Sequence, residues 1–95
     1  MFIVLLRFSD NKAQAAPWLA AHRAWLERGF DDGVFLLAGS LETKQGGAIL
    51  AHQTTREQLA ERLAADPFVQ AGVVTAEVIT VSPSKTADTL SFLLA

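Results

Sequence analysis

The hydrophobic residues of the chain gather into four short runs that have the length of β-strands. The runs occupy residues 2–8, 34–38, 48–52 and 73–81. In the first run both faces are apolar, which is typical of a strand that is covered on both sides. A polar connection that closes with Gly46 and Gly47 separates the second run from the third, and this arrangement predicts a hairpin.

Between the first and second runs, apolar residues recur with the period of an amphipathic helix. The helix is expected to begin near Ala13 or Ala16 and to end near Arg28, with Pro17 in its first turn and Gly29 as its stop. Proline is tolerated in the first turn because its missing N–H would have no partner within the helix.

A second helix is expected after the third run. Thr54 and Glu57 have the spacing of a capping box that opens this helix, which is expected to run to about Ala65. Asp66 and Pro67 then start one short helical turn before the last strand. The order is β-α-β-β-α-β, which predicts an α+β, ferredoxin-like fold with two helices on one face of an antiparallel four-stranded sheet.

Two helices leave the other face of such a sheet open, although the strand pattern predicts that both faces are apolar. The simplest solution is a second copy of the chain packed sheet to sheet, which predicts a homodimer with the architecture of a dimeric α+β barrel. We expect a pocket between each sheet and its helices, or at the rim of the barrel.

The chain has 95 residues, which is enough for one hydrophobic core. Residues 1–83 are therefore expected to form one domain. Residues 84–95 form a C-terminal tail that ends in an apolar segment. Such a segment is expected to pack on its own subunit or on a neighbouring one, and the second arrangement would build a higher homo-oligomer.

Composition excludes several classes of function. The chain has no cysteine, which excludes disulfides and thiol chemistry, and its 2 histidines are too few and too far apart to indicate a metal site. The formal charge is −2 and the basic residues are scattered, so we expect no nucleic-acid partner. We also expect no membrane association, because no apolar run approaches the roughly 20 residues of a membrane helix. The N-terminal segment lacks the pattern of a signal peptide, so a cytoplasmic location is expected.

His22 is the first candidate for chemistry. Trp18 lies one turn before it and Trp25 three residues after it, so the three side chains share one face of the expected helix. An imidazole held beside aromatic rings is a candidate general acid or base. The alternative interpretation is a packed residue of an amphipathic helix, and the local pattern leaves both open. His52, at the end of the third run, is expected to be solvated.

Asp66 also has two interpretations, and they are compatible. Before Pro67 it has the pattern of a helix N-cap. Because both helices lie on the same face of the sheet, its carboxylate is also placed to meet His22 and to orient the imidazole. Gly39 and Ser40 end the second strand, where glycine permits close backbone approach and a hydroxyl can bind a ligand. A β-bulge followed by a turn would explain the same two residues.

Taken together, these residues resemble the YCII-related (YciI-like) family of small dimeric α+β barrel proteins. The resemblance rests on the helical segment 22–26 with its glycine at position 29, and on the strand end Ala38-Gly39. The most specific part is segment 65–72, Ala-Asp-Pro-Phe-Val-Gln-Ala-Gly, which precedes the last strand. The resemblance covers about residues 1–83 and leaves the apolar tail outside.

The resemblance implies a ferredoxin-like subunit and a dimer. In that family a histidine and an aspartate are proposed as a paired active site, and those positions match His22 and Asp66 here. Some relatives are linked to the breakdown of substituted aromatic compounds, including removal of chloride from a hydroxylated ring. Many members have proline after the Ala-Gly, where this chain has Ser40, so the identity of the substrate does not carry over.

The leading hypothesis is an enzyme that needs no cofactor. His22, oriented by Asp66, would act as general base or acid on a small cyclic or aromatic organic acid, by isomerisation or by an elimination such as dehydrochlorination. Trp18, Trp25 and Phe68 would form apolar walls that exclude water. The alternative is a non-catalytic module that binds a small molecule or serves as an accessory subunit, which the apolar tail favours. A cofactor-free oxygenase ranks last, because nothing in the sequence indicates an electron-rich substrate.

Overall fold

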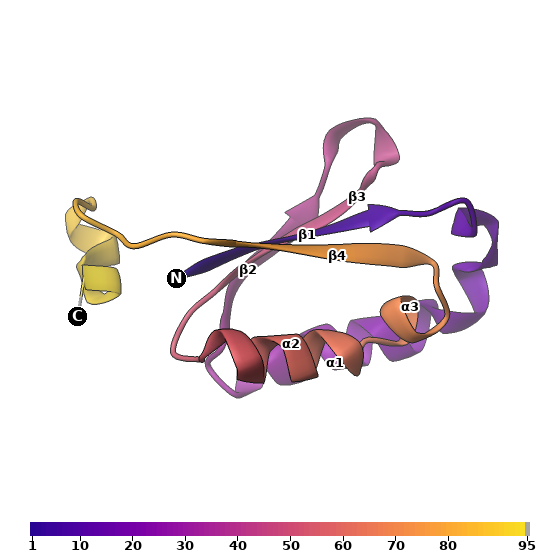
Figure 1. Cartoon of the computed structure of the whole chain (residues 1–95), viewed down its shortest axis with the longest axis horizontal. Coiled ribbons are helices and arrows are strands. Elements are labelled where there is room, and N and C mark those ends of the chain that lie inside the picture. Colours follow the sequence, from indigo (N-terminus) through magenta and orange to yellow (C-terminus); the bar gives the residue numbers. More distant parts are fainter. Residues whose placement is uncertain (95) are drawn as a thin grey trace.

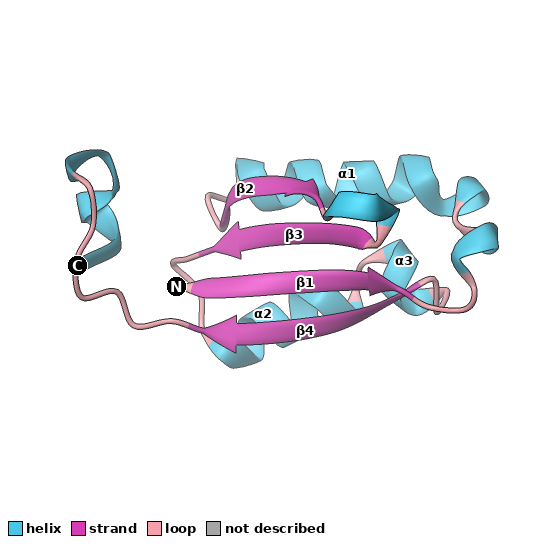
Figure 2. Cartoon of the chain, turned by 90° about the horizontal axis from the view of Figure 1, so that it is seen from above, coloured by secondary structure: helices cyan, strands magenta, loops and turns pink. Residues whose placement is uncertain are grey.

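The computed structural model describes residues 1–94 and shows an antiparallel sheet with helices α1, α2 and α3 on one face (Figures 1 and 2). The strands are β1 (Phe2–Phe8), β2 (Phe35–Ser40), β3 (Gly46–Ala51) and β4 (Val74–Thr80). The helices are α1 (Leu19–Asp31), α2 (Arg56–Ala64) and α3 (Pro67–Gln70). Short 3-10 turns η1 (Lys12–Gln14), η2 (Ala16–Trp18) and η3 (Glu42–Lys44) lie in the connections, and η4 (Asp88–Leu94) forms the C-terminal element.

The strands are ordered β2-β3-β1-β4, and β1 pairs antiparallel with both of its neighbours. Val4 lies opposite Ile49 on one side and opposite Val78 on the other, so these three side chains share one face of the sheet. β2 and β3 form the predicted hairpin, with a register shift between Phe35 and Leu37. This topology confirms the predicted α+β, ferredoxin-like fold.

Alternate residues of β1 form the centre of the core. Phe2, Val4 and Leu6 are buried beneath the helices, where Trp25 of α1 and Leu59 of α2 belong to the same cluster. Full burial of a side chain of this size contributes about 1.5–3 kcal/mol. A slip of one residue would turn the whole set to the opposite face, so this layer also determines the register of β1.

The opposite face of the sheet is apolar as well. Ile3, Leu37, Leu50 and Ile79 lie opposite one another across the four strands, and we call these residues the outer row. Leu37 is 55% exposed and Ile79 is 41% exposed. The described helices pack on the other side of the sheet, so they leave the outer row uncovered (Figure 2). The apolar pattern on both faces of β1 thus produces one core and one open apolar stripe.

α1 differs from its prediction at both ends. It follows a 3-10 turn at Ala16–Trp18, and it continues past Gly29 to Asp31, so the predicted stop at Gly29 is wrong. Gly29 is buried against Phe35, and the ring of Phe35 would collide with a Cβ atom at this position. Glycine here therefore makes room for an aromatic ring. The chain turns instead at Gly33, which has a φ of 73°.

The capping box of α2 lies one residue later than predicted. The hydroxyl of Thr55 accepts the Gln58 backbone N–H at 3.1 Å, and the Gln58 side chain accepts the Thr55 N–H at 3.3 Å. The predicted pair, Thr54 with Glu57, is therefore wrong. Both pairs fit the same Ser/Thr-x-x-Glu/Gln pattern, so the pattern alone did not distinguish them.

The C-terminal tail leaves the edge of the sheet and ends in η4, which lies apart from the layers (Figure 1). The ring of Phe92 meets the ring of His52 edge to face, with 5.5 Å between centroids. Leu90, Phe92 and Leu94 are exposed. The described part of the tail thus contacts its own domain through Phe92 and presents apolar side chains outward. Across residues 1–94, no helix has the length and hydrophobicity needed to span a membrane.

Candidate active site

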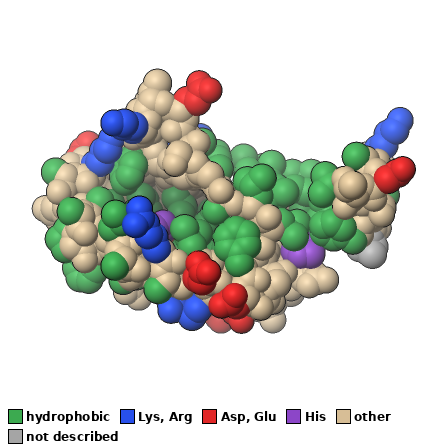
Figure 3. Space-filling model, turned by 180° about the vertical axis from the view of Figure 1, so that it is seen from behind, with side chains coloured by type: hydrophobic (Ala, Val, Ile, Leu, Met, Phe, Trp, Pro, Cys, Tyr) green, Lys and Arg blue, Asp and Glu red, His purple; other side chains and the backbone are tan. Residues whose placement is uncertain are grey.

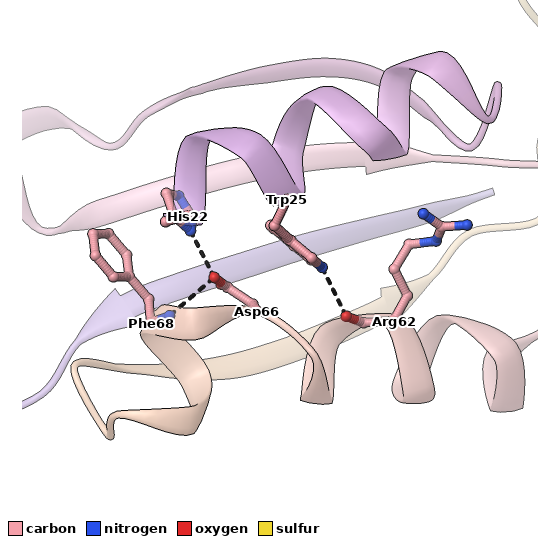
Figure 4. A network of polar contacts seen from close by, with 5 residues as sticks. All are labelled: His22, Trp25, Arg62, Asp66 and Phe68. Carbon is pink, nitrogen blue, oxygen red and sulfur yellow. Dashed lines mark hydrogen bonds and ion pairs between the residues drawn. The ribbon is translucent and has the colours of Figure 1, made fainter. Parts of the chain in front are cut away.

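The candidate active site is built on a hydrogen bond between His22 of α1 and Asp66, which lies between α2 and α3 (Figure 4). Nδ1 of His22 lies 2.7 Å from Oδ1 of Asp66. The Asp66 side chain is fully buried, whereas the His22 side chain is 12% exposed. The structure therefore places a buried carboxylate behind an imidazole that still reaches the surface.

Asp66 is held in place because it starts α3. Pro67 occupies the first turn of that helix, and Oδ1 of Asp66 also accepts the Phe68 backbone N–H at 3.0 Å. The N-cap and the contact with His22 thus exist together. Oδ2 is buried and has no hydrogen-bond partner among the described residues.

Two aromatic rings hold the plane of the imidazole. The Phe68 ring is nearly parallel to it, with centroids 4.1 Å apart and an interplanar angle of 9°. The indole of Trp25, one helical turn along α1, lies 5.7 Å from it. Trp25 is itself anchored, because its Nε1–H donates to the backbone carbonyl of Arg62 at 2.9 Å (Figure 4). Packing and hydrogen bonding together define one orientation of His22.

The hydrogen bonds also assign the proton on the imidazole. A carboxylate oxygen only accepts hydrogen bonds, so the proton between His22 and Asp66 is placed on Nδ1. In the neutral ring, Nε2 then has a free lone pair. Nε2 makes no hydrogen bond to the described residues and is not among the fully buried unpaired atoms. A ring that is oriented through one nitrogen and open at the other has the geometry of a general base.

His22 opens onto a cavity of about 550 Å³ between the sheet and α1. All four strands, α1, α3 and the loops after β1 and β2 contribute to its walls. Most lining side chains are apolar, including Leu6, Leu26 and Val74. Both the volume and the combination of apolar walls with a few polar groups are typical of small-molecule sites.

The predicted site residues occupy different positions around this cavity. Gly39, Ser40 and Phe68 line it. Gly39 and Ser40 pair regularly with β3, so the bulge considered for them does not occur there. Trp25 lies in the core behind the imidazole, and Trp18 is 45% exposed in the turn before α1. Neither tryptophan is among the described residues that line the cavity.

Three basic residues that were not predicted from the sequence also line the cavity, namely Lys12, Arg23 and Lys44. They come from the turn after β1, from α1, and from the loop between β2 and β3. The described lining contains no Asp or Glu. The fold brings these separate segments to one end of the sheet, so the signal for them lies in the topology and not in a local motif.

Comparison with known proteins agrees with this architecture. The fold is a ferredoxin-like domain with a cavity between its sheet and its helices, which defines the structural class. The profile of the YCII-related domain matches residues 1–82. The chain therefore belongs to the YCII-related domain family, as the sequence motifs predicted.

Among solved structures, the chain is similar to the 5-chloro-2-hydroxyhydroquinone dehydrochlorinase of Burkholderia phenoliruptrix AC1100, in its complex with 2,5-dihydroxybenzoquinone. The TM-score is 0.69 at 17% sequence identity, over 85% of this chain and 93% of the other. Likeness at this level of identity establishes a common fold. Curated protein sequences gave no match.

Proposed function

We propose that the protein is a cofactor-independent enzyme that uses His22 and Asp66 for general acid–base chemistry on a small cyclic or aromatic organic acid. One observation carries the proposal. Nδ1 of His22 is hydrogen-bonded to the buried carboxylate of Asp66 at 2.7 Å. Nε2 lacks a partner among the described residues, and the ring borders an apolar cavity. A histidine that served packing alone would need neither the oriented ring nor the adjoining cavity.

In the proposed reaction, Nε2 of His22 takes a proton from an acidic C–H or O–H group of the substrate. The electron pair left behind moves into the ring system of the substrate. In an elimination, that pair forms a new π bond while the bond to a leaving group such as chloride breaks, and the leaving group departs with the bonding electron pair. His22 later releases the proton to water. In an isomerisation, His22 returns the proton to another atom of the substrate. Asp66 stays hydrogen-bonded to Nδ1 and stabilises the imidazolium that forms.

The cavity suits such a substrate. Phe68 and Leu26 line it, and apolar walls exclude water and strengthen electrostatic interactions inside. The structurally similar dehydrochlorinase was solved with a hydroxylated quinone, a six-membered ring with acidic hydroxyl groups. We therefore propose elimination from a substituted ring as the first reaction to test.

The test is a turnover screen of small cyclic and aromatic acids, including chlorinated hydroxyquinols, with product analysis and chloride detection. Once a substrate is found, His22→Ala is expected to lower kcat/KM by about 10²–10⁴-fold, because it removes the general base. Asp66→Ala is expected to lower kcat through loss of orientation. His52→Ala is the matched control and is expected to leave turnover unchanged. Unchanged turnover in His22→Ala and Asp66→Ala would contradict the mechanism.

The second candidate function is a binding or accessory module, which the exposed apolar residues of η4 favour. In that case the cavity would hold a metabolite without changing it. A ligand that binds through His22 and is recovered intact after long incubation with the native protein would support this candidate. Conversion of the ligand would exclude it as the whole account.

We also propose that the outer row is covered by the same face of a second chain, which gives the homodimer predicted from the sequence. Leu50→Lys would place a charge in the centre of that interface and is expected to give monomers in sedimentation measurements. Truncation after Pro83 tests whether the tail joins dimers into a higher oligomer. An unchanged mass after truncation would exclude that role, and dimers that persist in Leu50→Lys would exclude the sheet-to-sheet arrangement.

A further inference from the structure

We infer that Lys12, Arg23 and Lys44 form an anion-binding subsite in the cavity, which selects substrates that carry a carboxylate or an ionised hydroxyl group. The inference rests on the proposed function, because it names the residues that would recognise the acid on which His22 acts. All three cations line the same cavity as His22, and Figure 3 shows basic side chains beside a hollow on this part of the surface. The formal charge of the chain is −2, so the local charge opposes the overall charge.

Lys12 is held in position by contacts within the protein. Its Nζ donates a hydrogen bond to the carbonyl oxygen of Lys44 at 2.9 Å and lies 4.9 Å from the centroid of the Phe8 ring. An ammonium group has three N–H donors, so two remain for a ligand. Because the cation–π contact and the hydrogen bond already order this side chain, binding an anion there would cost little conformational entropy.

The loop between β2 and β3 holds Lys44 in an unusual backbone conformation. Thr43 and Lys44 have φ values of 60° and 57°, in the left-handed region that strains residues other than glycine. Gly46 has a φ of 134°, and a Cβ there would collide with the carbonyl oxygen of Leu6. Close packing on β1 thus fixes this loop beside the cavity, where its carbonyl meets the ammonium of Lys12.

The subsite and the imidazole give a substrate two fixed points within one apolar chamber. An anionic group bound by these cations can form charge-assisted hydrogen bonds, while the rest of the ring contacts apolar walls that His22 also borders. A neutral molecule of the same shape would meet the same walls without those bonds. The cavity should therefore discriminate by charge, and the discrimination should fall as salt concentration rises.

Benzoate and benzamide test this directly, because they have nearly the same shape and differ in charge. Their dissociation constants are measured by NMR titration of the 15N-labelled full chain, whose spectrum also reports whether each variant is folded. Benzoate is expected to bind at least about tenfold more tightly than benzamide. Lys44→Gln keeps the carbonyl that Lys12 contacts, so it tests the charge without removing that hydrogen bond. It is expected to weaken benzoate binding by about five- to tenfold and to leave the dissociation constant of benzamide unchanged.

Lys12→Gln is expected to weaken benzoate at least as much as Lys44→Gln. Lys85→Gln, an exposed substitution in the tail, is the matched control and is expected to change neither constant. Three results would overturn the subsite: equal affinity for the two probes, undetectable benzoate binding, or a benzoate dissociation constant that neither cavity substitution changes. The readout is binding alone, so it separates the two proposals. Lysine-dependent benzoate binding without any turnover would support the subsite and reject the proposed reaction. His22-dependent turnover without a preference for benzoate over benzamide would support the reaction and reject the subsite.

Discussion

Alanine substitution of His22 and Asp66, singly and together, is expected to reveal an interaction free energy of about 2–3 kcal/mol between the two side chains. The expectation follows from their unequal burial. Asp66 is fully buried, and its Oδ2 atom has no partner among the described residues, so the contact with His22 is one of few that compensate the buried charge.

The magnitude follows from what each variant leaves behind. In His22→Ala, the Phe68 N–H remains as the one donor to the carboxylate among the described residues. Removing a donor from a buried carboxylate costs more than the roughly 1–3 kcal/mol of a neutral group, and we take about 3–4 kcal/mol because the adjoining cavity admits water and limits the penalty. With alanine already at position 66, the same substitution removes little more than the stacking on Phe68, about 1 kcal/mol. The difference between these two costs of His22→Ala, with aspartate and with alanine at position 66, is the interaction free energy.

The assay is urea unfolding of the four proteins at one fixed concentration, followed by tryptophan fluorescence, to which Trp25, 2% exposed in the folded state, contributes. The control is the same cycle on Arg7 and Glu77, an exposed pair 3.6 Å apart. This pair is expected to give less than about 1 kcal/mol. If the His22 and Asp66 effects add to within about 0.5 kcal/mol, the argument from burial is refuted.

Three further changes in stability are expected, each measured by urea unfolding. Thr55→Ala should destabilise the protein by about 1 kcal/mol through loss of the α2 cap, whereas Thr54→Ala should cost less than half as much, and equal effects would argue against the observed cap. Gly29→Ala should cost about 1–3 kcal/mol because the new methyl group meets the ring of Phe35, and a stabilised protein would contradict that contact. Trp25→Phe removes a buried indole N–H donor and some volume, so a loss of about 1–3 kcal/mol is expected, and no loss would mean that the hydrogen bond to α2 contributes nothing.

The fold was predictable because its strands carry a strong signal. Residues of β1 alternate between the buried core and the opposite face of the sheet, so apolar character on both faces of the run marks a central strand in the sequence itself. The helix boundaries were less predictable for a physical reason. Gly29 satisfies the rule for a helix stop, and only the distant ring of Phe35 shows why glycine is needed within α1. Thr54 and Thr55 both satisfy the rule for a cap, and local pattern does not rank them.

Some residues of the candidate site could likewise be predicted from the sequence, and others could not. His22 and Asp66 could be selected from the sequence, because aromatic neighbours and a following proline mark them locally, and their hydrogen bond is present in the structure. Their catalytic role stays a prediction. Lys12 and Lys44 carry no local mark, since each follows or precedes ordinary polar loop residues. Their common place at one cavity depends on how β1 and the β2–β3 loop meet in three dimensions.

A single oxygen atom, Oδ1 of Asp66, accepts both the Nδ1–H of His22 and the backbone N–H of Phe68. Local opening of α3 displaces Asp66, which caps it, together with Phe68, whose ring stacks on His22, and would release the imidazole in the same event. The orientation of His22 and the first turn of α3 thus form one cooperative unit, whose opening free energy is smaller than or equal to that of global unfolding. Hydrogen exchange at the Phe68 amide then reports the fraction of molecules with a correctly oriented ring. On heating, the protein should lose that orientation at or below the temperature at which its sheet unfolds.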